Sequence, residues 1–154
     1  INVRLSENFS LLELTKSDTA IRKDIDNTPD DVVTANLQAL VTNVLQVVRD
    51  KFGSVKVTSG YRSPPLNSSI GGSKTSQHCF GFAADFEVGG MDNKELAVWI
   101  RDNLEFTQLI LEFYTEGDAN SGWVHCAYDA TDLKKQVLTA TKVDGKTKYL
   151  TGIA

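Results

Sequence analysis

The sequence predicts an α+β domain in which N-terminal helices pack on a mostly antiparallel sheet. In the first third of the chain, apolar residues recur at helical spacing between residues 33 and 48. Later segments alternate apolar and polar residues in the manner of strands, and turn-forming residues separate them. The length of 154 residues suits one domain, spanning residues 1–154, with a single hydrophobic core.

Two helices are predicted before residue 53. The run SLLE from Ser10 to Glu13 has the form of a capping box, so a short helix is expected there. Thr28 followed by Pro29 predicts an N-cap and a proline at the first helical position. The helix that follows is the longest and ends at Gly53. Its buried stripe is expected to comprise Val33, Leu37, Leu40, Val41, Val44, Leu45 and Val48.

The remaining chain reads mostly as strands. Asp92 and Glu95 predict the start of one further helix, and Asp144-Gly145 predicts a final hairpin. Prolines and glycines predict a long irregular segment after the first strand, at Pro64, Pro65, Gly71 and Gly72. Strands are expected at residues 55–59, 82–88, 108–114 and 123–128, with a turn at residues 116–122 between the last two.

Composition and charge exclude several classes of partner. The net charge of −4 argues against binding to nucleic acid, which requires a basic patch. No apolar run is long enough to span a bilayer, and the N-terminal residues lack the layout of a signal peptide. Because the first residue is Ile1, a leader could already have been removed. A monomer without a membrane span or a nucleic-acid partner is expected.

An unusual arrangement of three residues predicts a metal site. The chain has two histidines, His78 and His125, and Asp85 lies between them. Asp85 interrupts the apolar run from Phe82 to Phe86, where a charge is out of place unless it is paired or bound to a metal. Two imidazoles and one carboxylate suit a divalent transition metal with an open coordination position, which a catalytic site requires.

The two cysteines, Cys79 and Cys126, each directly follow a histidine and are expected to be structural. Two cysteines are too few for a disulfide framework. Strand alternation places Cys126 on the face opposite His125, in a core position where a free cysteine packs well. A thiolate ligand from either residue remains an alternative.

Three linked motifs resemble a known family. The run SQHCFGFAAD from Ser76 to Asp85 resembles the S-x-H-x-x-G-x-A-x-D signature of the zinc D-Ala-D-Ala carboxypeptidases, a family that includes D,D-dipeptidases of vancomycin resistance and phage endolysins. The run WVH ending at His125 is similar to the second metal segment of that family. The run SGYRSP, with Asn67, Gly71 and Gly72 after it, resembles its upstream motif.

The resemblance implies the fold, the cofactor and the substrate class. It implies a hedgehog/D,D-peptidase-like fold and one zinc ion per chain, held by His78, Asp85 and His125. It also implies hydrolysis of peptides in bacterial peptidoglycan, by a carboxypeptidase or by an endolysin-like endopeptidase. The protein would then act at the cell wall, either as a phage lysin or as a processed bacterial chain. The sequence does not reveal which bond is cut.

The general base departs from the family pattern. Several relatives carry a glutamate three residues before the last histidine, where this chain has Gly122. Glu112 is the expected substitute, because it interrupts an apolar strand. If Tyr114 pairs with Trp123 in a hairpin, Glu112 lies opposite His125 on the same face. The weaker candidates are Glu116, Asp118 and Asp129.

Arg62, Ser76 and Gln77 complete the expected site. The family counterpart of Arg62 holds the developing oxyanion or the substrate carboxylate, and a guanidinium suits both roles. Ser76 and Gln77 are expected to bind the substrate or to orient a metal ligand.

Two other functions remain open at this point. A catalytically inactive zinc module could bind cell-wall peptides without cutting them, which the glycine at position 122 would favour. A site with two histidines and one carboxylate could also hold Fe(II) and activate oxygen, although the usual His-x-Asp spacing is absent here.

Overall fold

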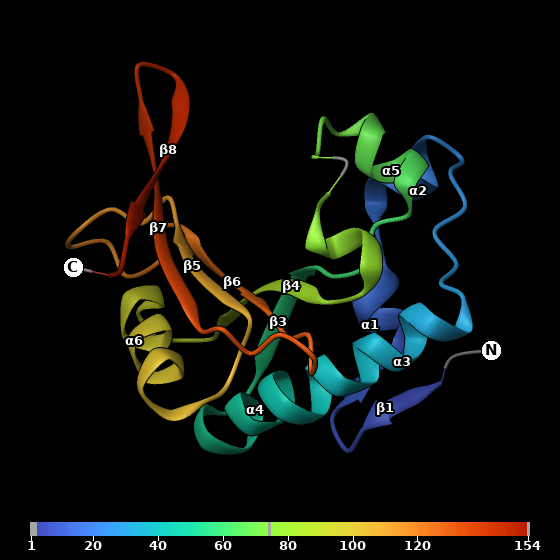
Figure 1. Cartoon of the computed structure of the whole chain (residues 1–154), viewed down its shortest axis with the longest axis horizontal. Helices are drawn as coiled ribbons and strands as arrows, with labels where there is room; N and C mark the ends of the chain where they lie inside the picture. The colour runs from blue at the N-terminus through green and yellow to red at the C-terminus, as the bar shows by residue number, and fades with distance from the viewer. Residues whose placement is uncertain (1–2, 74, 154) are drawn as a thin grey trace.

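Six strands form the main sheet in the computed structural model, which describes residues 3–73 and 75–153 (Figure 1). Their spatial order is β3-β4-β6-β5-β7-β8. Neighbouring strands are antiparallel except β5 and β7, which are parallel, so the predicted α+β class is confirmed with a mixed sheet. The strands are β3 (Val55–Ser59), β4 (Ala83–Val88), β5 (Gln108–Glu112), β6 (Trp123–Ala127), β7 (Gln136–Val143) and β8 (Lys146–Thr151).

Helices precede and interrupt this sheet. A short ribbon of β1 (Arg4–Ser6) and β2 (Phe9–Ser10) leads into them. No helix in the described part of the chain is both long enough and apolar enough to cross a bilayer. The helices are α1 (Leu11–Thr15), α2 (Asp18–Arg22), α3 (Asp31–Leu40), the π-helical turn η1 (Val41–Leu45), α4 (Gln46–Phe52), α5 (Pro64–Ser69), the 3₁₀ turn η2 (Gln77–Phe80) and α6 (Asn93–Asn103).

Capping explains where most of these helices begin and end. The capping box is present, with both of its hydrogen bonds between Ser10 and Glu13. Asp92 caps α6, and Gly53 ends α4 with a φ of 97°. Each of these three predictions is confirmed. The helical start at Thr28 is wrong, because the Asp30 side chain accepts a hydrogen bond from the Val33 amide at 2.8 Å and so begins α3 two residues later.

A second correction concerns the segment expected to be irregular. Residues Pro64–Ser69 form α5, whose N-cap is Ser63 and whose first helical position is Pro64. A proline there removes no helical hydrogen bond and presets the backbone angle. The proline rule that failed at Thr28 therefore applies at Ser63.

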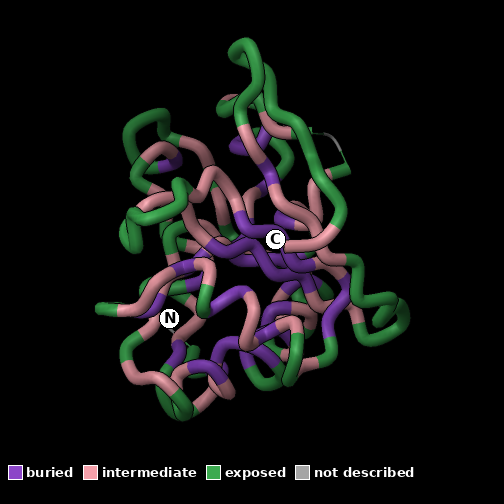
Figure 2. Tube along the Cα trace, turned by 90° about the vertical axis from the view of Figure 1, so that its left-hand side faces the viewer, coloured by how far each residue is buried: buried purple, intermediate pink, exposed green. Residues whose placement is uncertain are grey.

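The helices and the sheet share one core. The stripe of α3, η1 and α4 is buried, and it joins one cluster with residues from the inner face of the sheet. Phe86 of β4, Leu109 of β5 and Val124 of β6 are each fully buried in that cluster. Figure 2 shows the buried segments gathered at the centre of the molecule, with exposed loops around them. The opposite face of the same strands is left to carry the site.

The last two strands form a hairpin at the edge of the sheet. Asp144 and Gly145 connect them, and both have positive φ angles, of 51° and 77°. Positive φ at both central residues is typical of a two-residue turn that matches the twist of paired strands. The predicted hairpin is confirmed, and Figure 1 shows it rising away from the body of the protein.

Candidate metal centre

Three elements bring the predicted metal ligands together. Asp85 lies on β4 and His125 on β6, and the two residues are direct neighbours across the antiparallel pair. Directly opposed residues share one face of the sheet. His78 comes from η2, the turn that precedes β4. Gly81 ends that turn with a φ of 76°, and a side chain there would meet the backbone of Val33.

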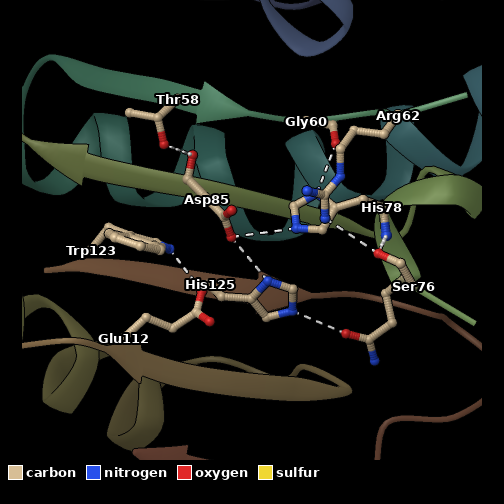
Figure 3. Close-up of polar contacts among 10 residues, drawn as sticks. Thr58, Gly60, Arg62, Ser76, His78, Asp85, Glu112, Trp123 and His125 are labelled. Carbon is tan, nitrogen blue, oxygen red and sulfur yellow. Dashed lines mark hydrogen bonds and ion pairs between the residues drawn. The ribbon is translucent and has the colours of Figure 1, made fainter. Parts of the chain in front are cut away.

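The three side chains converge on a common point (Figure 3). Their donor atoms all lie within 4.8 Å of one another. Asp85 Oδ1 is 3.4 Å from His78 Nε2 and 3.0 Å from His125 Nδ1. Two nitrogens and one carboxylate oxygen at this separation form a donor set that could hold one divalent transition metal ion.

Hydrogen bonds on the far side of each imidazole orient the rings. His78 Nδ1 lies 2.7 Å from the Gly60 carbonyl oxygen, and His125 Nε2 lies 3.0 Å from Gln77 Oε1. Both oxygens are acceptors, so each of these nitrogens donates a proton. The other nitrogen of each ring then keeps its lone pair directed at the shared point. Such outer partners of metal-binding histidines set the ring tautomer.

The electrostatics of the three residues suit metal binding, because ligands must be deprotonated. Burial lowers the pKa of His78 and so favours the neutral ring. Burial alone would raise the pKa of Asp85. Its close contacts with His125 and His78 outweigh that effect and hold its pKa below the usual range. Asp85 therefore remains ionised.

The cysteines stand apart from this donor group. Among the described residues, the only groups that meet at this point are His78, Asp85 and His125. Cys126 is fully buried in the core, on the strand face opposite His125, and burial raises the pKa of its thiol. Cys79 is partly exposed and is also a free thiol.

The triad lies at the floor of a cleft of ≈ 480 Å³. One side is formed by the loop before η2 and by Arg62, and the other by β5, β6 and β8. All seven predicted site residues line it. The full lining is Arg62, Ser73, Thr75, Ser76, Gln77, His78, Asp85, Gln108, Ile110, Glu112, Trp123, His125 and Tyr149.

The strand register around Glu112 differs from the prediction by two residues. Glu112 pairs with Trp123, and Ile110 pairs with His125. The hairpin is shorter because Phe113 has a φ of 55°, which ends β5 at Glu112, two residues before Tyr114. Side chains alternate with a period of two, so a shift of two leaves Glu112 on the face that carries His125. The predicted register is wrong, but the predicted face is correct.

The Glu112 carboxylate is held inside the cleft. It is half-buried and accepts a hydrogen bond of 2.7 Å from Trp123 Nε1 (Figure 3). Burial raises the pKa of Glu112, and the negative charge of Asp85 raises it further, while His125 and the Trp123 hydrogen bond act in the opposite direction. A carboxylate with a raised pKa beside a metal site suits proton transfer.

Gly122 is closed to any side chain. Its φ is 65°, and a Cβ atom there would lie 2.2 Å from the Glu112 carbonyl oxygen. A glutamate could not occupy this position without moving the end of β5. The carboxylate that enters the cleft therefore comes from the neighbouring strand instead.

The weaker candidates for the base lie elsewhere. The exposed Glu116 forms an ion pair with Lys94, and Asp118 caps the turn that contains Asn120. Asp129 accepts hydrogen bonds from Thr131. None of these carboxylates is among the residues that line the cleft.

Arg62 and Ser76 form the other wall. Arg62 donates a hydrogen bond of 3.4 Å to Ser76 Oγ, and this hydroxyl also accepts from the His78 amide at 3.3 Å. Ser76 thus links the guanidinium to the turn that carries a histidine of the triad. Within the described residues, the buried Nε of Arg62 has no hydrogen-bond partner.

Several lining residues escaped the sequence analysis. Gln108 and Trp123 lie two positions from residues on the site face, so strand alternation could have identified both. Tyr149 lies on β8, whose place beside the cleft depends on the parallel pairing of β5 with β7. No local pattern in the sequence indicates that pairing.

Comparison with known proteins agrees with this geometry. Over 80 residues, the chain is 39% identical to a protein of Streptomyces albus G named zinc D-Ala-D-Ala carboxypeptidase. The aligned part is 50% of this chain and 31% of that protein, so the chain spans about a third of the relative it matches. The family model described as peptidase M15 matches residues 7–127, which include the triad, Arg62 and Glu112. Because that match covers well over half of its length, the chain belongs to the peptidase M15 family.

Proposed function

We propose that this protein is a zinc-dependent peptidase that hydrolyses peptide bonds in bacterial peptidoglycan, as a D-Ala-D-Ala carboxypeptidase or an endolysin-like endopeptidase. The observation that carries the proposal is the convergence of His78, Asp85 and His125 in a cleft that also holds Glu112. Family membership supports the peptidase activity, and the name of the Streptomyces relative supports zinc and the substrate class. A monomer acting at the cell wall belongs to the same proposal.

The donor set fits one zinc ion per chain. His78 Nε2, His125 Nδ1 and one carboxylate oxygen of Asp85 would hold it, and three protein ligands leave a position for water and substrate. When bound, zinc supplies Lewis-acid polarisation of the scissile carbonyl and lowers the pKa of water to about 7.

The proposed roles of the other residues follow from their positions. Glu112 accepts a proton from the attacking water and passes it to the leaving amine, and its Trp123 hydrogen bond fixes the carboxylate in place. Arg62 faces it across the cleft and binds the oxyanion or the substrate carboxylate. Gln77 and the Gly60 carbonyl orient the two imidazoles, and Ser76 positions Arg62.

A non-catalytic zinc module that binds wall peptides is the second candidate. The glycine at position 122 favours it, since the family resemblance implies a glutamate there in several members. The position of Glu112 favours the enzyme, because a binding module has no need of a half-buried carboxylate beside the donor set.

Digestion of purified muropeptides separates the two candidates. The zinc-loaded protein is expected to release new amines, either free D-Ala or separated stem peptides, as measured by mass spectrometry. A chelator should abolish the release, and added zinc should restore it. Binding of muropeptides without any product, across peptidoglycans of different cross-link chemistry, would support the binding module and reject the peptidase.

A further inference from the structure

The far wall of the cleft comes from a part of the chain that the family match does not reach. That match ends at residue 127, whereas Tyr149 lies on β8 and lines the same cleft as the triad. Figure 1 shows the β7–β8 hairpin and α5 at opposite sides of the molecule. The hairpin therefore lies outside the matched residues and borders the proposed active site.

The strand register explains why Tyr149 faces the cleft. Trp123 pairs with Glu112, Glu112 with Ala140, and Ala140 with Tyr149, so the four residues form one row across four strands. Residues in such a row share a face of the sheet. Ala140 is buried and offers only a methyl group between Glu112 and Tyr149. Two strand spacings separate Glu112 from Tyr149, or about 10 Å, which equals about three residues of an extended peptide.

Tyr149 is available to a ligand. The residue is 55% exposed and lies at the mouth of the cleft. In the described part of the chain its hydroxyl has no hydrogen-bond partner, and its ring stacks on no other aromatic ring. Aromatic side chains bury a large apolar area at little cost in conformational entropy, so exposed tyrosines at a cleft are suited to packing on a peptide.

One lysine of the hairpin lies on the sheet face that borders the cleft. Residues 133–154 carry a net charge of +4 in a chain whose total is −4, but Lys146 and Lys148 lie on the opposite face of the hairpin. Lys142 is on the face that carries Tyr149, because it lies two residues after Ala140 and pairs with Thr147. Its ammonium lies 5.5 Å from the centre of the Phe113 ring, beside the end of β5. Lys142 does not itself line the cleft, so its ammonium could act only on a substrate residue that extends along this face of the hairpin.

We propose that Tyr149 and Lys142 form a specificity subsite on the Glu112 side of the scissile bond, which accepts an acidic residue of the peptide. This inference rests on the proposed function. When Arg62 holds a terminal carboxylate, the remaining peptide crosses the metal site toward the hairpin. The ring of Tyr149 packs on its chain about three residues away, and Lys142 faces the carboxylate. In a stem peptide ending in D-Ala-D-Ala, the D-Glu residue stands at that distance.

Equilibrium binding to a Glu112→Gln background tests the subsite without turnover. The probes are the pentapeptide L-Ala-D-γ-Glu-L-Lys-D-Ala-D-Ala and the tripeptide L-Lys-D-Ala-D-Ala, titrated into zinc-loaded protein. Adding Tyr149→Ala should weaken binding of the pentapeptide by about tenfold and leave the tripeptide unchanged. Tyr149→Phe should restore binding. The matched control is Leu150→Ala, since Leu150 is the exposed neighbour on the opposite strand face. Its truncation should leave the affinity for both probes unchanged.

The charge is tested separately with a pentapeptide in which the D-Glu carboxylate is amidated. Lys142→Gln should weaken binding of the acidic pentapeptide by about two- to fivefold at low salt and leave the amidated one unchanged. This difference should vanish at high salt.

The outcomes separate this inference from the proposed function. Pentapeptide binding that depends on Tyr149, with no cleavage by the zinc-loaded wild-type protein, supports the subsite and rejects the D-Ala-D-Ala carboxypeptidase. The subsite is overturned if the pentapeptide does not bind. It is also overturned if Tyr149→Ala binds the pentapeptide as tightly as its parent, or if Tyr149→Ala and Leu150→Ala weaken both probes equally.

Discussion

The central strands β4 and β6 and the C-terminal hairpin β7–β8 line the same cleft, but they differ in nearly every physical respect. All but two residues of β4 and all but one of β6 are buried, whereas every residue of β8 is exposed. The central strands carry Asp85 and His125, and the hairpin carries Tyr149. The difference indicates that the proposed chemistry resides where packing is tightest and the proposed selectivity resides where it is loosest.

Rigidity accounts for this division. Metal ligands must keep a narrow geometry. Strands that are paired with a neighbour along both edges, together with hydrogen-bonded imidazole rings, provide it. A hairpin at the sheet edge contributes little to the core and so tolerates sequence change. Lys146 and Lys148 lie on the hairpin face opposite Tyr149, where charged side chains protect an exposed edge strand from pairing with other chains.

The largest expected effect lies in the central region. Glu112→Gln preserves the shape of the side chain but cannot accept a proton, so kcat should fall by about 10²–10⁴ while zinc content remains near one per chain. Steady-state kinetics on muropeptides measure the change, and Glu116→Gln is the matched control because Glu116 is exposed and pairs with Lys94. Near-normal turnover of the Glu112→Gln variant would show that Glu112 is not the general base. Loss of zinc from this variant would indicate that Glu112 is a metal ligand.

The central strands and the hairpin should also differ in how much they contribute to the free energy of unfolding. Phe86 on β4 is fully buried, so Phe86→Ala should lower the free energy of unfolding by about 3–5 kcal/mol. Leu150 on β8 is 45% exposed, and Leu150→Ala should change it by less than about 0.5 kcal/mol. Urea denaturation of the two variants measures both values. Equal losses would mean that the hairpin is part of the core.

A smaller effect should come from the hydrogen bond behind His125. Removing the Gln77 acceptor leaves the imidazole unoriented, so Gln77→Ala should weaken zinc affinity by about 10- to 100-fold. Competition with a zinc-binding dye measures the affinity. Gln108→Ala is the control, since Gln108 lines the same cleft but bonds to Gln136. Equal affinity in the Gln77→Ala and wild-type proteins would contradict the orienting role.

The smallest effect is a shift in pH dependence. The base must be ionised, and burial raises the pKa of Glu112, so kcat/KM should fall as pH decreases through that raised value. The acid limb should therefore lie above the ordinary glutamate pKa of 4.5. Zinc content measured at each pH separates this limb from loss of metal. An acid limb that persists unchanged in Glu112→Gln would assign it to another group.

Local chemistry made part of the fold predictable. The capping box at Ser10, the glycine after α4 and the Asp144-Gly145 turn each act through neighbouring residues, and each was predicted correctly. Thr28 was chosen wrongly as an N-cap and Ser63 was missed. Both residues precede a proline. They differ because Asp30, and not Thr28, is the N-cap of α3, whereas Ser63 is the N-cap of α5.

The residues of the candidate site were also predictable from local sequence only, and not where their positions depend on pairing between strands. The charge of Asp85 within an apolar run identified the donor set, because an unpaired buried charge is costly wherever the fold places it. The predicted pairing of Glu112 was wrong by two residues, since the true pairing depends on the backbone of Phe113 and Gly122. Tyr149 could not be found at all, because its position depends on the pairing of β7 with a strand distant in the sequence.

The central claim is that His78, Asp85 and His125 bind one zinc ion, and metal analysis by mass spectrometry tests it most directly. Protein purified without added metal and then exposed to equimolar zinc should retain about one ion per chain after dialysis. His125→Ala should retain far less, with an unchanged circular dichroism spectrum as the control for folding. One zinc per chain in a folded His125→Ala variant would contradict the account.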